Sequence, residues 1–203
     1  MAVPPHYENT DVRIDKLVVG PVENNVFVVR CKSTGDALIV DAANEHELLL
    51  EVSQATGVRR VLTTHGHWDH IQAVEALRDA GIEVGISAED ASMLPSYDFV
   101  IPEDAVVELG DLRLRTILNP GHTPGSMSFL IEDHPILFSG DTLFPGGPGN
   151  TTFEGGDFSQ IITSIDRKLF TLPGDTLVLP GHGLDTTIAS ESPHLQEWVD
   201  RGW

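Results

Sequence analysis

Residues 63–70 read TTHGHWDH, and the interpretation of the whole chain starts from them. They place three histidines and one aspartate within six consecutive residues, directly after a short run at 58–62 that predicts a buried strand. Neutral imidazole and carboxylate are the usual ligands of zinc and of similar first-row metals. The stretch therefore predicts a metal site where that strand ends, although a solvated polar loop would fit any one of these histidines taken alone.

The spacing of these four side chains predicts two neighbouring metal positions. His65 and His67 are two residues apart, so in an extended chain that leaves a strand they point the same way. Asp69 and His70 follow after a bend and face elsewhere. Trp68, which lies between the two pairs, either forms a wall of the site or packs against the protein.

Length and composition predict a single domain spanning residues 1–203, with a sizeable core. No apolar run approaches the roughly 20 residues that span a bilayer. The first eleven residues have neither a basic start nor an apolar stretch, so we expect no signal peptide. The single cysteine, Cys31, excludes an internal disulfide and fits a reducing cytoplasm.

The chain is strongly acidic, with 31 acidic against 12 basic residues and a formal net charge of -19. Such a balance argues against a nucleic acid or an anionic membrane as the main partner. Bound divalent cations would offset part of the charge locally. Acidity by itself names no function, and the expectation of a small-molecule partner comes from a family resemblance, not from the charge.

Hydrophobic periodicity and turn residues predict alternating strands and helices. In the first half we expect strands at 12–19, 26–30 and 37–40, a helix at 45–56, a strand at 58–62, a helix at 71–80, a strand at 82–86, a short helix at 88–94 and irregular chain at 95–102. In the second half we expect strands at 106–109, 112–118, 127–131 and 136–138, a Gly/Pro-rich loop at 144–156, a helix at 158–170 with Asp157 as N-cap, a strand at 176–179 and a short helix within 193–203. Two sheets packed face to face between outer helices would bury these runs.

Four predicted strand ends carry polar residues that stand out from their surroundings: the 63–70 stretch, His122, Asp141 and His182. His122 and His182 both occur in Pro-Gly-His, where glycine allows the backbone to turn tightly and bring the imidazole to a shared site. These segments hold five of the nine histidines. The remaining four are interpreted as surface residues: His6, His46, His134 and His194.

The order HxHxDH, His, Asp, His resembles the signature of the metallo-β-lactamase superfamily and covers nearly the whole chain. The resemblance implies an α+β fold, a four-layer αββα sandwich of two mixed sheets with a metal site at one edge. It implies that the first metal is bound by His65, His67 and His122, the second by Asp69, His70 and His182, and that Asp141 bridges the two.

Asp41 matches a further aspartate of this family at the end of an early strand. We expect it to fix the 63–70 stretch or to orient a ligand imidazole, the alternative being an ordinary turn residue.

The implied chemistry is metal-dependent hydrolysis. Two divalent cations, zinc with iron or manganese as alternatives, lie about 3.5–4 Å apart in such sites and share a water whose pKa falls toward neutrality. The bridging hydroxide then attacks a carbonyl, so that no serine or cysteine nucleophile is needed. Asp141 and Asp69 are the predicted catalytic residues, and Asp69 is a candidate to accept a proton as the intermediate collapses.

Several stretches resemble the compact glyoxalase II-like (hydroxyacylglutathione hydrolase-like) branch: NPGHTPGS at 119–126, FSGDTLF at 138–144 and PGHG at 180–183. That branch hydrolyses thioesters such as S-lactoylglutathione. The bridging Asp141 differs from true β-lactamases, and Cys31 lies too far upstream to match their cysteine ligand. Two departures stand out. Few residues follow His182, where longer enzymes carry a helical domain, and no Lys or Arg occurs between Asp141 and Arg167 to meet the carboxylates of glutathione.

Four other functions remain as alternatives. Lactone or ester hydrolysis would use the same site. A persulfide dioxygenase with one iron does not depend on a full second ligand set, whereas this chain retains Asp69, His70 and His182. An RNase Z-like nuclease is disfavoured by the charge, and a binding-only protein by the seven filled ligand positions. The acyl group, the thiol carrier, the native metal, the oligomeric state and the role of residues 144–156 are left open.

Overall fold

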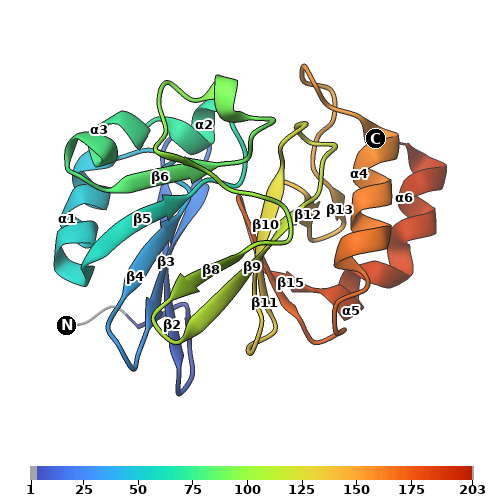
Figure 1. Ribbon diagram of the computed structural model, residues 1–203. Helices are drawn as coiled ribbons and strands as arrows, with labels where there is room; N and C mark the ends of the chain where they lie inside the picture. The colour runs from blue at the N-terminus through green and yellow to red at the C-terminus, as the bar shows by residue number, and fades with distance from the viewer. Residues whose placement is uncertain (1–3, 203) are drawn as a thin grey trace.

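Two β-sheets pack face to face, and helices cover both outer faces, in the computed structural model, which describes residues 4–202 (Figure 1). The first sheet has the order β1-β2-β3-β4-β5-β6-β7. Its strands are β1 (Tyr7–Glu8), β2 (Val12–Val19), β3 (Asn24–Cys31), β4 (Ala37–Val40), β5 (Val58–Leu62), β6 (Glu83–Ile86) and β7 (Phe99–Val100). Pairing is antiparallel from β1 to β4 and parallel from β4 to β7.

The second sheet has the order β15-β14-β11-β10-β9-β8. Its strands are β8 (Val106–Leu109), β9 (Leu112–Leu118), β10 (Met127–Ile131), β11 (Ile136–Gly140), β14 (Leu177–Pro180) and β15 (Thr186–Thr187). Only β11 and β14 pair in parallel within this sheet. A separate two-stranded ladder, β12 (Leu143–Phe144) with β13 (Gly147–Pro148), follows β11.

The helices form the two outer layers (Figure 1). On the first sheet lie α1 (His46–Thr56), α2 (Trp68–Ile71), α3 (Val74–Asp79) and the 3₁₀ turn η1 (Ala91–Met93). On the second lie α4 (Phe158–Ser164), the π-helical turn η2 (Ile165–Leu169), α5 (Ile188–Glu191), η3 (Ser192–His194) and α6 (Leu195–Arg201). The predicted αββα sandwich with two mixed sheets is therefore observed. None of the described helices is long and apolar enough to cross a membrane.

Strand β3 shows how the sequence builds three apolar layers. Successive strand residues face opposite sides of a sheet. Accordingly, Phe27 and Val29 pack into the cluster between the sheets, whereas Val26 and Val28 join the cluster under α1 and α3. A third cluster lies between the second sheet and its helices, with Trp198 of α6 nearly fully buried in it. Strands buried on both faces explain why their sequences read as continuous apolar runs.

The differences from prediction lie in the bounds of some elements and in short elements. The strand predicted at 26–30 spans 24–31, and the strand predicted at 136–138 spans 136–140. The helix predicted at 71–80 is split into α2 and α3, and α2 begins at Trp68, inside the 63–70 stretch. The predicted 88–94 helix is the single turn η1. Residues 95–102 contain the two-residue edge strand β7, and the predicted 144–156 loop contains β13. Two-residue strands are too short to show periodicity.

Helix 158–170 is observed as α4 continued by η2, and its predicted N-cap is confirmed. The Asp157 carboxylate accepts a hydrogen bond from the Gln160 backbone N–H at 2.9 Å. This contact satisfies one of the free donors of the first helical turn.

The contact between Phe27 of β3 and Phe138 of β11 joins the two sheets, with ring centroids 5.3 Å apart. Phe138 is fully buried, so Phe138→Ala leaves a cavity and should lower the free energy of unfolding by about 3–5 kcal/mol. Denaturant unfolding measures this loss. Val18→Ala is the control, because Val18 is 57% exposed and its truncation should change stability by no more than about 0.5 kcal/mol. Equal stability of the two variants would contradict this description of the core.

Candidate metal centre

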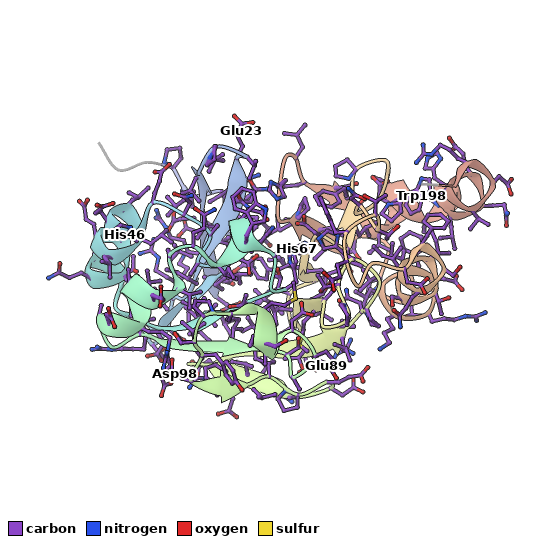
Figure 2. The ribbon with its side chains drawn as sticks, turned by 90° about the horizontal axis from the view of Figure 1, so that it is seen from above. Glu23, His46, His67, Glu89, Asp98 and Trp198 are labelled. Atoms are coloured by element: carbon purple, nitrogen blue, oxygen red, sulfur yellow. The ribbon has the colours of Figure 1, made fainter. Side chains whose placement is uncertain are left out.

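The predicted site residues lie at one edge of the sandwich because the strands that precede them run in the same direction. Asp41 follows β4 and His65 follows β5, which is parallel to β4. Asp141 and His182 follow β11 and β14, which are also parallel. His122 follows β9, and β9 and β11 are both antiparallel to β10. Seen from above, His67 lies between the two halves of the molecule (Figure 2).

One group of imidazoles consists of His65, His67 and His122, whose ring nitrogens lie within 4.8 Å of one another. His122 Nε2 lies 3.2 Å from His65 Nε2 and 2.9 Å from His67 Nδ1. Three nitrogens at these distances either share protons or surround a cation. Three converging neutral imidazoles are a typical zinc ligand set.

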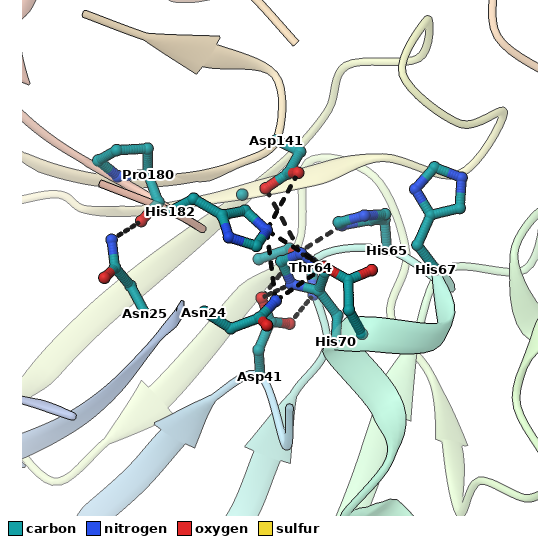
Figure 3. A network of polar contacts seen from close by, with 12 residues as sticks. Asn24, Asn25, Asp41, Thr64, His65, His67, His70, Asp141, Pro180 and His182 are labelled. Carbon is teal, nitrogen blue, oxygen red and sulfur yellow. Dashed lines mark hydrogen bonds and ion pairs between the residues drawn. The ribbon is translucent and has the colours of Figure 1, made fainter. Parts of the chain in front are cut away.

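A second group consists of Asp69, His70 and His182. Figure 3 shows His70 and His182 of this group beside Asp141. Asp69 Oδ2 lies 3.2 Å from His182 Nε2 and 3.5 Å from His70 Nε2. Asp69 and His70 stand in α2, whereas His65 and His67 precede it. The bend predicted between the two pairs is therefore the start of a helix.

Asp141 lies between the two groups. Its Oδ1 is 3.5 Å from His70 Nε2, and its Oδ2 is 3.7 Å from His122 Nε2 and 3.6 Å from His182 Nε2. The carboxylate thus faces members of both groups. This is the position that a residue bridging two cations would occupy.

Two buried atoms at the centre test whether a cation fits. His70 Nε2 and Asp141 Oδ1 are buried and have no hydrogen-bond partner. Leaving a buried polar atom unsatisfied costs about 1–3 kcal/mol. A divalent cation between a neutral imidazole and a carboxylate would satisfy both atoms. The donor set therefore fits two divalent metal ions.

The outer nitrogens of most of these imidazoles are fixed by acceptors. In four histidines Nδ1 faces an oxygen atom. His65 Nδ1 lies 3.0 Å from Thr64 Oγ1, and His70 Nδ1 lies 2.9 Å from Asp41 Oδ2. His122 Nδ1 lies 2.6 Å from the Asn150 carbonyl oxygen, and His182 Nδ1 lies 3.0 Å from the Val22 carbonyl oxygen. A carbonyl or carboxylate can only accept, and the Thr64 hydroxyl already donates to Asp41, so Nδ1 of each of these histidines carries a proton and Nε2 faces the centre. Metal-binding histidines are commonly oriented in this way.

Asp41 makes both kinds of contact predicted for it. Its Oδ1 accepts the Thr64 backbone N–H at 2.7 Å, which fixes the start of the 63–70 stretch. Its Oδ2 accepts from Thr64 Oγ1 at 2.8 Å and from His70 Nδ1 at 2.9 Å, which orients an imidazole. Asp41 is buried and adopts a left-handed backbone conformation with φ of 63°.

Burial and neighbouring charges separate the two groups in their proton affinity. Burial lowers the pKa of His65 well below its ordinary value, and burial with the neighbouring His122 lowers the pKa of His67 to about 4. Burial likewise outweighs Asp141 and lowers the pKa of His122. These three imidazoles are therefore neutral at pH 7.

In the second group, carboxylates prevail over burial. Burial lowers the pKa of His70, but Asp141 and Asp41 together raise it well above its ordinary value. The pKa of His182 is raised in the same way, chiefly by its hydrogen bond to Asp69. Burial raises the pKa of Asp69 and Asp141, but the surrounding imidazoles hold both below the ordinary range. Both carboxylates are therefore ionised.

Sequence reasoning missed Asn24, which stands at the first position of β3. Its Nδ2 donates to Asp69 Oδ2 at 2.9 Å and lies 3.3 Å from His182 Nε2. Because β3 is antiparallel to β4, its N-terminal end meets the same edge as the carboxyl end of β4. The available signal was the pair Asn24-Asn25, two amide side chains directly before an apolar run. The structure shows that both side chains are buried.

Sequence reasoning also missed Asp90, a fully buried carboxylate that joins two loops of the site. Its Oδ2 accepts the Gly66 backbone N–H at 3.0 Å and the Thr123 hydroxyl at 2.6 Å. Its Oδ1 accepts the Gly125 backbone N–H at 2.7 Å. One side chain thus links the segment of His65 and His67 to that of His122. No sequence signal marked Asp90, which lies in an ordinary polar context.

A cavity of about 340 Å³ opens onto the candidate ligands. Its lining contains His67, Asp69, His122, Asp141 and His182, together with Val22, Trp68, Phe144, Asn150 and Phe153. Trp68 is 58% exposed, so of its two predicted roles the structure favours the wall of the site.

Comparisons with known proteins find related sequences and structures. The family model described as the metallo-beta-lactamase superfamily matches residues 19–182, which include all seven candidate ligands. YqgX, a probable metallo-hydrolase from Bacillus subtilis, is 32% identical over 197 residues, covering 87% of this chain and 92% of that protein. The hydroxyacylglutathione hydrolase GloC of Haemophilus influenzae is 33% identical over 178 residues, covering 77% and 84%. The crystal structure of BLEG-1, a B3 metallo-beta-lactamase, superposes with a TM-score of 0.81 at 30% identity, covering 89% and 97%.

The contacts of Asp90 predict that it stabilises the first imidazole group. Asp90→Asn replaces an acceptor oxygen by an NH₂ group that faces a backbone N–H, which should lower the free energy of unfolding by about 1–3 kcal/mol. It should also weaken metal binding by the His65 group, measured as metal retained per chain against a competing chelator. Glu89→Gln is the control, because Glu89 is exposed and adjacent in sequence. If Asp90→Asn matched Glu89→Gln in both measurements, the two loops would not depend on this carboxylate.

Proposed function

The chain belongs to the metallo-beta-lactamase superfamily, and on that premise we propose that it is a dinuclear metallohydrolase that cleaves a small thioester of the S-lactoyl-thiol type. The observation that carries the proposal is the position of Asp141, whose carboxylate faces both candidate ligand groups. Seven protein ligands for two cations favour hydrolysis over a reaction that needs a single iron. A cytoplasmic location is part of the same proposal.

The proposed ligands are the seven predicted ones: His65, His67 and His122 for the first metal, Asp69, His70 and His182 for the second, and Asp141 for both. Zinc is the expected metal, with iron or manganese as alternatives. Two such cations supply a water activated at neutral pH and polarise the carbonyl of a substrate.

The protein's own side chains hold these groups in place and handle the proton. Asn24 donates to Asp69 Oδ2 and holds this carboxylate at the cavity wall. The low pKa of Asp69, set by His182 and His70 against burial, keeps it ionised, and it is the candidate to accept the proton of the attacking hydroxide as the intermediate collapses. That proton then passes to the sulfur as the C–S bond breaks. Asp41 keeps His70 Nε2 directed at the centre.

The thioester part of the proposal rests on sequence similarity. The stretches 119–126, 138–144 and 180–183 resemble glyoxalase II-like enzymes. A relative named as a hydroxyacylglutathione hydrolase is 33% identical over most of its length. The geometry supports hydrolysis at a carbonyl and leaves esters, lactones and β-lactams as competing substrates.

The first experiment is the metal content of protein purified without added metal, measured by elemental mass spectrometry. We expect about two metal ions per chain. The metal-loaded protein is then assayed on a panel of thioesters, acyl-lactones, aryl esters and a chromogenic β-lactam. A single iron per chain, with oxygen consumed in the presence of a persulfide, would replace the hydrolase by the dioxygenase.

Asp141→Ala tests the bridging position. The variant should stay folded but lose most of its metal and, with it, most of its turnover, because one carboxylate serves both cations. His194→Ala is the control, since its Nδ1 contacts the exposed Glu197, away from the candidate ligands. Full turnover of Asp141→Ala, or metal loss from His194→Ala, would mean that the ligands are assigned wrongly.

The pKa directions predict that the two metals respond differently to acid. Protons compete with a metal only below the pKa of its ligands. As the pH falls through the ordinary histidine pKa of about 6.5, His70 and His182, whose pKa values are raised, take up protons before His65, His67 and His122, whose pKa values are lowered. Acidification should therefore release the second metal first.

Two variants separate these metals: His182→Ala weakens the second group and His67→Ala the first. After dialysis over a pH series, metal should persist to lower pH in His182→Ala than in His67→Ala. Equal pH midpoints in the two variants would contradict the prediction.

A further inference from the structure

The cavity beside the candidate metal centre has an apolar rim made of Val22, Trp68, Phe144 and Phe153. Trp68 is 58% exposed, Phe153 57% and Val22 44%. Large apolar side chains are usually buried, and a cluster of exposed ones beside a site marks a surface that binds something. Such a rim contacts the parts of a substrate that project from the reacting carbonyl.

The rim is assembled from separate segments around the ligands. Val22 precedes β3, Trp68 begins α2, Phe144 ends β12, and Phe153 follows β13. The Phe153 ring lies edge-on to His67, with centroids 5.4 Å apart. Val22 accepts the Nδ1 hydrogen bond of His182. The rim is therefore tied to candidate ligands on both sides, and Phe144 and Phe153 belong to the loop whose role the sequence left open.

No lysine or arginine lines this cavity among the described residues, and its charged members other than histidine are Asp69 and Asp141. Lys16 contacts the segment of His182, but its Nζ donates to the Gly183 carbonyl at 2.7 Å and lies 3.8 Å from Asp185. A substrate carboxylate outside the metal centre would therefore meet no cation able to replace its hydration.

We propose that this site selects thioesters whose thiol part carries no carboxylate, binding that part by apolar contact with Trp68 and Phe153. The inference rests on the proposed function and narrows its substrate class. The reacting carbonyl lies at the centre, and the uncharged thiol part extends along the rim. An anionic tail such as that of glutathione is disfavoured, because the cavity offers carboxylates and aromatic faces where cations would be needed.

Two thioesters that share the lactoyl group test the selection. S-lactoyl-N-acetylcysteamine is uncharged, whereas S-lactoylglutathione carries two carboxylates. With protein of verified metal content, kcat/KM should be at least about tenfold higher for the uncharged thioester. Trp68→Ala and Phe153→Ala should raise KM for that substrate severalfold with little change in kcat or metal content.

Phe153→Arg supplies the missing cation. It should raise kcat/KM for S-lactoylglutathione and lower it for the uncharged thioester, so that the ratio of the two moves toward glutathione. Val106→Arg is the control: it adds the same charge at a partly exposed residue of the edge strand β8, outside the cavity lining, and should leave the ratio unchanged.

The outcomes distinguish the inference from the function on which it rests. Hydrolysis of neither thioester by the two-metal protein would remove the proposed function, and the inference with it. Hydrolysis of S-lactoylglutathione as fast as or faster than the uncharged thioester would overturn the inference and leave the hydrolase in place. An equal shift of the ratio by Val106→Arg would show that net charge, not the rim, sets the preference.

Discussion

The structure of this protein depends on a cluster of imidazole nitrogens and a carboxylate oxygen that are held close together at the candidate metal centre. His122 Nε2 has ring nitrogens of two other histidines at 2.9 and 3.2 Å, while His70 Nε2 and Asp141 Oδ1 are buried without a hydrogen bond. In a folded protein, buried polar atoms are almost always satisfied. Such atoms stay close together only where the surrounding structure holds them in place. A bound cation would give all of them a partner.

Both sheets contribute to this arrangement, so the packing of the sandwich and the geometry of the centre are coupled. Residues 65–70 come from the first sheet, whereas His122, Asp141 and His182 come from the second. The apolar layer between the sheets, with its Phe27–Phe138 contact, sets the distance between the two sets. Two buried carboxylates fix the positions of the ligand segments. Asp41 holds the 63–70 stretch within the first sheet, and Asp90 joins this stretch to the loop of the second sheet that carries His122.

Much of this was predictable, because the relevant signals are local in sequence and lie at strand ends. The strands 12–19, 37–40, 58–62, 106–109, 112–118 and 127–131 have the predicted bounds. Residues 37–40 and 127–131 are buried at every position and read as continuous apolar runs, whereas 106–109 and 112–118 include exposed positions and are bounded by turn residues. The seven candidate ligands converge because strands of like direction end at one edge. Asp90 and the Phe153–His67 contact were not predictable, since each depends on where a loop crosses the site and carries no periodic signal.

The candidate ligands lie at strand ends and part of the substrate cavity lies in loops, so the reaction chemistry and the choice of substrate depend on different parts of the chain. Candidate ligands follow directly from strand ends, where a shift of one residue would turn a side chain away from the centre. Part of the rim, Val22 and Phe153, instead comes from connecting segments that can change in sequence without moving a strand, whereas Trp68 stands within the 63–70 stretch. Under the proposed function, the ligand pattern therefore determines how a carbonyl is attacked, whereas the rim, apolar and without lysine or arginine among the described residues, selects the molecule that presents it.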